Sequence, residues 1–230
     1  MLSVVLLLAS TLAAPAAGVQ QSAPSYEVAV KGAGSRGQLV FTVSEVAFDA
    51  VDAKKSQRWQ YRELKQIRVI SPRQIAFDTF EDGGRWRFGA DRTVEFDVVE
   101  GTIGGTLVAF LLENIRRPVA SAVLPAGLGE PTIRVAAKHL RGRKGTHGAI
   151  AVYPSGIAYE TDARGGSRYW RFADIESILR TSSDRILVDV YEDGSVRPFS
   201  FALKDPFPTT AFDEVWNRVN EPAQRSGGGR

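Results

Sequence analysis

The densest cluster of charge in the sequence is a short basic segment, residues 138–147. It holds four basic side chains and two histidines, and no acidic residue. Several guanidinium and ammonium groups on one segment suit a multiply charged anion such as a phosphate, because each group can donate charge-assisted hydrogen bonds to its oxygens. A solvated basic β-hairpin loop that binds nothing is the alternative interpretation. The residues that we predict to bind an anion are Lys138, Arg141, Arg143 and Lys144.

The two histidines of the chain, His139 and His147, both lie in this segment. Two imidazoles could ligate a metal, but no Asp, Glu or Cys within the segment completes the set of ligands that a zinc site needs. The chain has no cysteine, which removes disulfides, thiolate nucleophiles and thiolate metal sites. We therefore expect no metal site.

Residues typical of an enzyme are scarce. No Gly-x-Ser-x-Gly sequence offers a serine nucleophile. Asp189 and Glu192 fall on a predicted strand edge and turn, where solvation explains them. Residues 32–37 match a dinucleotide-binding glycine pattern, but a strand-like run at 39–43 follows where a helix would have to receive the pyrophosphate. We expect a turn there, no cofactor and no enzymatic activity.

The composition is that of an ordinary globular chain. The 230 residues are 43% hydrophobic and 24% charged, and 29 basic against 26 acidic residues leave a net charge of +3. Nucleic-acid-binding domains usually carry a larger positive charge that is gathered on one face. We therefore expect no nucleic-acid partner, and the length allows one or two domains.

The N-terminal segment predicts export. No charged side chain occurs between Met1 and Tyr26, and an apolar run from Leu2 to Ala13 precedes small residues at 14–18 that suit a signal peptidase. The run is shorter than the roughly 20 apolar residues that span a bilayer. We expect residues 1–18 to be a signal peptide of a periplasmic or secreted protein, with an uncleaved N-terminal membrane tether as the alternative.

An internal repeat organises the remainder of the chain. Residues 36–83 align with residues 147–194 without a gap, at an offset of 111. The alignment pairs Trp59 with Trp170 and Asp78 with Asp189, repeats the tripeptide Glu-Asp-Gly, and keeps the apolar residues in phase. A solenoid unit has a period of about 20–50 residues, so this longer repeat indicates a duplicated domain.

Each half of the sequence predicts strands followed by a helix. Alternating apolar residues predict the strands, and Asp-Gly dipeptides predict tight hairpins, the first of which returns at 85–88. Helices are expected at 103–115 and at about 209–219. Prolines and glycines make residues 117–131 a predicted linker, and residues 221–230 are expected to be a disordered tail. The apolar face of the second helix contains Phe212, Val215, Trp216 and Val219.

The order of these elements resembles the pleckstrin-homology-like fold, and within it the bacterial and GRAM-like branches. The sequence Trp-x-[Tyr/Phe]-x-[Asp/Glu]-[Leu/Ile], at Trp59 and Trp170, is part of the resemblance. It implies a mainly β chain with two capping helices, in domains at 26–116 and 132–220. Each would be a bent antiparallel sheet of barrel or roll form, closed by its C-terminal helix, with the tryptophan in its core. The resemblance also places the basic segment in a loop with which such domains often bind lipid phosphates.

Two kinds of function fit these observations. The first is a non-catalytic interaction module that binds a protein partner or an anionic surface such as lipid headgroups. The second is a carrier of a small apolar ligand inside a curved sheet. Free strand edges would also allow the chain to form a homo-oligomer. The hint in favour of a carrier is a set of small residues at predicted core positions, Ala47, Ala149, Ala151 and Ala158.

Overall fold

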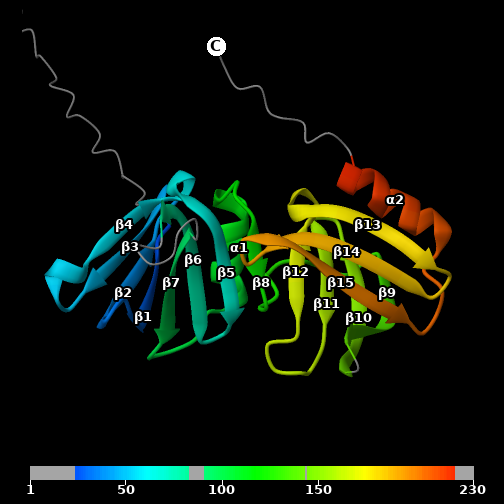
Figure 1. Cartoon of the computed structure of the whole chain (residues 1–230), viewed down its shortest axis with the longest axis horizontal. Coiled ribbons are helices and arrows are strands. Elements are labelled where there is room, and N and C mark those ends of the chain that lie inside the picture. The colour runs from blue at the N-terminus through cyan, green and yellow to red at the C-terminus, as the bar shows by residue number, and fades with distance from the viewer. Residues whose placement is uncertain (1–23, 83–90, 143, 221–230) are drawn as a thin grey trace, which may run out of the picture.

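The computed structural model describes residues 24–82, 91–142 and 144–220. Within these ranges the chain is mainly β, with fifteen strands in one large mixed sheet and two α-helices (Figure 1). Four features named above lie outside the described residues: the expected signal peptide at 1–18, the returning strand at 85–88, Arg143, and the expected tail at 221–230.

In the described ranges, each half of the chain contains seven strands followed by an α-helix. The first half consists of β1 (Tyr26–Gly32), β2 (Ser35–Phe41), β3 (Glu45–Ala50), η1 (Ala53–Lys55), β4 (Gln57–Gln60), η2 (Tyr61–Glu63), β5 (Leu64–Ser71), β6 (Gln74–Asp82), β7 (Asp91–Val98) and α1 (Gly105–Asn114). The second half consists of β9 (Ile133–Arg141), β10 (Lys144–Tyr153), β11 (Gly156–Glu160), β12 (Arg168–Arg171), η3 (Phe172–Asp174), β13 (Ile175–Ser182), β14 (Arg185–Glu192), β15 (Ser195–Leu203) and α2 (Thr209–Asn220).

The two halves have the same topology. The strands of the first half lie in the order β4-β3-β2-β1-β7-β6-β5, and their equivalents in the second lie in the order β12-β11-β10-β9-β15-β14-β13. The bounds of β4, η2 and β5 recur at β12, η3 and β13, so that 57–60 becomes 168–171 at the offset of the sequence repeat. The duplication that the sequence predicts is therefore present in the fold.

A short strand joins the halves into one sheet. This strand, β8 (Val119–Ser121), comes from the segment that we expected to be only a linker; it is buried, runs parallel to β5 and pairs with β12 (Figure 1). The N–H of Ala122 also donates to the carbonyl of Val69 at 2.8 Å. Because β5 and β12 pair with β8, they do not pair with β4 and β13. The described strands of each half thus form an open sheet, and the barrel or roll form that we expected is not confirmed.

Two-residue hairpins fix the register of the strands. Ala33 and Gly34 connect β1 to β2 with φ of 48° and 75°, and Asp193 and Gly194 connect β14 to β15 with φ of 59° and 74°. Positive φ at both positions is the type I′ geometry, whose twist matches that of paired strands. The turn predicted within residues 32–37 is thus confirmed. The second hairpin places Asp193 at the junction of the two halves.

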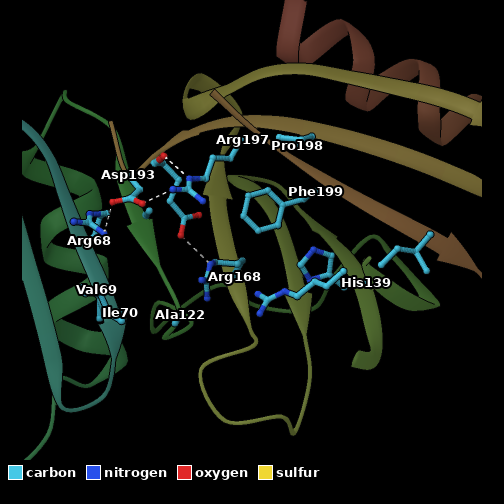
Figure 2. A pocket seen from close by; sticks show the side chains of 14 residues that line it. Arg68, Val69, Ile70, Ala122, His139, Arg168, Asp193, Arg197, Pro198 and Phe199 are labelled. Carbon is cyan, nitrogen blue, oxygen red and sulfur yellow. Dashed lines mark hydrogen bonds and ion pairs between the residues drawn. The ribbon is translucent and has the colours of Figure 1, made fainter. Parts of the chain in front are cut away.

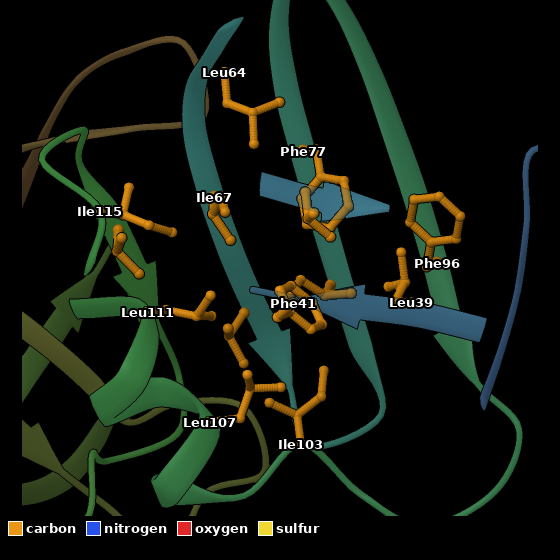
Figure 3. Packing of buried hydrophobic residues seen from close by; sticks show 14 of the residues in the cluster. Leu39, Phe41, Leu64, Ile67, Phe77, Phe96, Ile103, Leu107, Leu111 and Ile115 are labelled. Atoms are coloured by element: carbon orange, nitrogen blue, oxygen red, sulfur yellow. The ribbon is translucent and has the colours of Figure 1, made fainter. Parts of the chain in front are cut away.

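Each half has its own hydrophobic core. In the first, Leu107 and Leu111 of α1 pack against a sheet that contributes Phe41 (Figure 3). Trp59 and Trp170 are 5% and 2% exposed. A buried tryptophan removes a large apolar area from water, so both residues anchor their cores as predicted.

Helix α2 covers the second core with fewer residues than we predicted. Val215 is buried, and Phe212 and Val219 pack half-buried against the core, whereas Trp216 is 46% exposed. Consecutive residues of a helix point about 100° apart, so Val215 and Trp216 do not both face the sheet. The prediction that Trp216 closes the core is wrong.

Arg171 of β12 connects the end of α1 to the second half through hydrogen bonds. Its guanidinium group donates to the carbonyls of Leu112, Ile115 and Arg117 at 2.6–2.8 Å, and to the carboxylate of Asp174 at 2.7 and 3.0 Å. The last carbonyls of an α-helix have no partner within the helix. Arg171 supplies partners for the carbonyls at this end of α1 from across the junction.

Gln66 of β5 forms a second set of hydrogen bonds between the first half and the second. The side chain is fully buried; its Nε2 donates to the carbonyl of Tyr191 at 2.6 Å, and its Oε1 accepts from the N–H of Asp193 at 3.0 Å. One amide thus satisfies both a donor and an acceptor of the β14–β15 hairpin, and holds Asp193 against the first half.

Replacing Gln66 by alanine is expected to lower the free energy of unfolding by about 1–2 kcal/mol, because both backbone groups lose their partner. Urea unfolding followed by tryptophan fluorescence measures the change. Gln38 is exposed and bonds only to the side chain of Glu27, so Gln38→Ala is a matched control with an expected effect below about 0.5 kcal/mol. Equal effects of the two substitutions would show that the hydrogen bonds of Gln66 do not stabilise the junction between the halves.

Candidate ligand-binding cavity

A cavity of about 520 Å³ lies at the junction of the two halves. Figure 2 shows Arg68, Val69 and Ile70 of β5 on one side and Arg168, His139 and Phe199 of the second half on the other. Small-molecule pockets range from roughly 300 to 1,000 Å³, so this cavity has room for an organic ligand. The lining residues from the second half include His139, Arg141, Arg168, Glu192, Asp193, Arg197 and Phe199.

The alternation of strand residues explains why these side chains face one space. Side chains two residues apart on a strand point to the same face. On β9, His139 lies on the buried face and Arg141 follows on that face at the end of the strand. On β15, Arg197 and Phe199 share the face of Phe201, which pairs with His139 across the two strands. The inner face of the second half therefore extends into the cavity.

An ion-pair network spans the cavity wall. Arg68 binds the carboxylate of Asp78 with two hydrogen bonds of 2.8 and 3.0 Å, and its Nη1 lies 3.1 Å from Asp193. Arg197 is also paired with Asp193. Asp193 is therefore shared between a guanidinium group of each half, as the dashed lines of Figure 2 show.

The remaining two arginines of the cavity, Arg168 and Arg141, have fewer contacts with carboxylates. Nε of Arg168 lies 3.3 Å from Glu192, close enough for an ion pair but not oriented for a hydrogen bond, so this Nε and Oε2 of Glu192 are buried without a hydrogen-bond partner. The side chain of Arg141 forms no ion pair or hydrogen bond with any residue that the structure describes. Three of the four guanidinium groups thus have a carboxylate partner, and Arg141 supplies the uncompensated charge.

His139 contributes a neutral polar group beside this charge. The imidazole is only 4% exposed, stacks on Phe199 with ring centroids 5.3 Å apart, and packs against Phe201. Burial, together with the positive charges of Arg141 and Arg168, lowers the pKa of His139 to about 4. Its Nδ1 is buried and has no hydrogen-bond partner among the described residues. At neutral pH this side chain is an uncharged imidazole with a free nitrogen.

The basic segment that we singled out in the sequence is not a loop. It is the end of the β9–β10 hairpin, in which Arg141 pairs with Lys144 and Lys138 pairs with His147 across the two strands. Strand alternation places Lys138 on the face opposite to Arg141. Among the four residues predicted to bind an anion, only Arg141 lines the cavity, and Arg143 lies outside the described residues. Anion binding by the whole set stays a prediction.

Sequence reasoning did not bring the other cavity residues together, because they come from strands far apart in the chain; His139 and Glu192 were considered, but for other roles. One signal could have indicated Arg68. The repeat aligns Asp78 with Asp189 but Arg68 with Leu179, so the buried ion pair has no counterpart in the second half. Such a departure from the repeat marks a residue with a role in one half only.

Two of the four alanines that suggested an apolar carrier pack away from the cavity. Ala151 and Ala158 pack with Tyr153 and Tyr169, and this cluster is covered by leucines of α1 and of the segment between the halves. These two alanines make room for that segment and do not line the cavity. In the described part of the chain, no group of three or more His, Cys, Asp or Glu residues could hold a metal ion.

Comparison with known proteins adds little to this geometry. No protein family and no curated protein matches the sequence. Among solved structures, the chain is similar to one described as "Structure of the Spt16D Pob3N heterodimer", with 9% sequence identity and a TM-score of 0.29, over 80% of this chain and 98% of that chain. Within the described ranges, neither helix has the length and apolar character needed to cross a membrane. The similarity to that solved structure indicates no ligand or partner for this chain.

Proposed function

We propose that the protein is a non-catalytic binding module that captures an anionic ligand in the cavity between its halves. The observation that carries the proposal is Arg141, which lines the cavity without a carboxylate partner among the described residues, beside the neutral imidazole of His139. A guanidinium group forms strong, charge-assisted hydrogen bonds with carboxylate or phosphate oxygens. An excess of positive charge in a recessed site also raises the local concentration of anions.

The side chains of the cavity favour binding over catalysis. Among the described residues, the lining contains no serine, threonine, cysteine, tyrosine or lysine that could act as a nucleophile. Its one imidazole is influenced by two arginines and packs among aromatic rings, with no carboxylate to orient it. A general base usually requires such an orienting partner. The chemistry that remains is recognition of charge and shape.

Each half is proposed to be a pleckstrin-homology-like domain. Seven strands followed by a helix, in the same order twice, support this proposal. Export through residues 1–18 is likewise proposed on the sequence alone. The mass of the mature protein, purified from the native host, would show whether this segment is removed.

Binding is tested by calorimetric titration of the full chain with sodium acetate, decanoate, 2-naphthoate and inorganic phosphate at fixed ionic strength. We expect at least one of these anions to bind, and Arg141→Gln to weaken the tightest of them tenfold or more, since a charge-assisted hydrogen bond contributes about 1.5–3 kcal/mol. Lys138→Gln is the matched control, because Lys138 lies on the other face of the same strand. Its effect should stay within about twofold.

Binding to vesicles of anionic lipid distinguishes an anion site in the cavity from one on the surface of the β9–β10 hairpin, which the sequence suggested. Binding to such vesicles that depends equally on Lys138 and Arg141 would indicate that the whole hairpin contacts a membrane, and would overturn the cavity proposal. Failure of every soluble anion to bind would overturn it as well.

A further inference from the structure

We infer that the anion taken by the cavity is a monovalent carboxylate carried on a flat, unsaturated ring system. This inference rests on the proposed function, because it names the chemical class of the ligand for the same site. The charge of the wall, its aromatic surface and the position of His139 support it independently.

The charge of the wall suits one negative charge. Arg68 and Arg197 are paired with Asp78 and Asp193, and Arg168 is paired with Glu192 at 3.3 Å. Of the four arginines that line the cavity, only Arg141 has no carboxylate partner among the described residues. A phosphate dianion would bring a second negative charge close to Glu192, whose Oε2 already lacks a hydrogen-bond partner. Like charges at close range repel each other, so a monoanion fits this wall better.

The guanidinium group of Arg141 can bind one carboxylate. A guanidinium group presents two parallel N–H donors, so both oxygens of one carboxylate can accept hydrogen bonds from Arg141. His139 and Arg141 are two residues apart on the same face of β9, which separates their Cα atoms by roughly 6.6 Å. The His139 ring is neutral at pH 7, so a carboxylate at Arg141 would meet one positive charge there and not two.

The remaining surface of the cavity suits a flat apolar body. Phe199 and the His139 imidazole are nearly parallel, at 27°, and both line the cavity. Pro198 lies beside Phe199, with Val69 and Ile70 on the opposite wall (Figure 2). The volume of about 520 Å³ exceeds what a small inorganic anion fills. A flat ring that lies between Phe199 and the wall formed by Val69 and Ile70 would occupy this apolar part while its carboxylate reaches Arg141.

Calorimetric titration of the full chain with 2-naphthoate is the test. We expect 2-naphthoate to bind at least tenfold more tightly than 2-naphthamide, which has the same shape without the charge. It should also bind at least tenfold more tightly than acetate and than 2-naphthyl phosphate. Phe199→Leu should weaken 2-naphthoate at least fivefold and leave acetate unchanged, whereas Phe201→Leu, on the same face of β15 but outside the cavity lining, controls for a loosened core.

The outcomes separate this inference from the proposed function. If phosphate or decanoate binds as tightly as 2-naphthoate, and Arg141→Gln abolishes that binding, the anion site stands and the ring carboxylate is wrong. If no anion binds, both are wrong. If 2-naphthamide binds as tightly as 2-naphthoate, the site is an apolar pocket and both are again overturned.

Discussion

Replacing Arg171 by alanine is expected to lower the free energy of unfolding by about 3–5 kcal/mol. The substitution removes the partner of Asp174, whose side chain is 6% exposed, and the donors to three carbonyls at the end of α1. Burial raises the pKa of the Asp174 carboxyl and Arg171 opposes this rise, so loss of Arg171 leaves a carboxylate that is costly to ionise. The urea midpoint, compared at constant slope, measures the change.

The matched control is Arg58→Ala. Arg58 also pairs with a carboxylate, that of Glu45, but its side chain is 65% exposed, and exposed ion pairs contribute about 0–1 kcal/mol. Arg171→Lys keeps the charge but loses the planar fork of donors, so its stability should lie between those of the wild type and Arg171→Ala. If Arg171→Ala is no less stable than Arg58→Ala, then Arg171 does not hold the two halves together.

His139 is expected to make the protein less stable in acid. In an unfolded chain the pKa of a histidine is about 6.5, whereas burial, Arg141 and Arg168 lower the pKa of folded His139 to about 4. Between these values the unfolded state takes up a proton that the folded state does not. The contribution of His139 is therefore fully present above about pH 6.5 and is lost as the pH falls toward 4. The difference between the two pKa values amounts to about 3 kcal/mol, most of which is lost between pH 7 and pH 4.

Comparison with His139→Phe isolates this contribution. The ring is surrounded by Phe199, Phe201 and Tyr159, so phenylalanine preserves the aromatic contacts but does not titrate. Every other group that responds to acid is common to both proteins. Between pH 7 and pH 4 the wild type should lose about 2–3 kcal/mol more than the variant, in urea unfolding at each pH. Parallel curves for the two proteins would show that His139 is not buried as a neutral ring.

Much of the fold could be predicted because it depends on local pattern and repetition. The alternation of apolar residues around Trp59 and Trp170 predicts their strands, and the constant offset between them predicts that both halves share one topology. The tight turn at Gly194 follows from the Asp-Gly dipeptide that favours positive φ, and the turn at Gly34 from the glycine-rich run at 32–37. These features need no information about distant contacts.

The junction between the halves could not be predicted in the same way. Arg171 aligns in the repeat with Gln60. Nothing in the sequence around Arg171 indicates that its side chain bonds to the carbonyls at the end of α1. The strand β8 has three residues within a segment rich in proline and glycine, too short for a periodic pattern. The cavity residues converge only after this strand has joined β5 to β12.

The same three-residue strand has a consequence for the behaviour of the protein in concentrated solution. A sheet edge exposes unpaired backbone groups that can recruit a strand from another molecule, which is a common route to aggregation. Two separate halves would present four such edges, whereas the joined sheet ends only at β4 and β13. β8 covers the edges of β5 and β12 at once. The connection between the duplicated units thus protects both of them from polymerising through these edges.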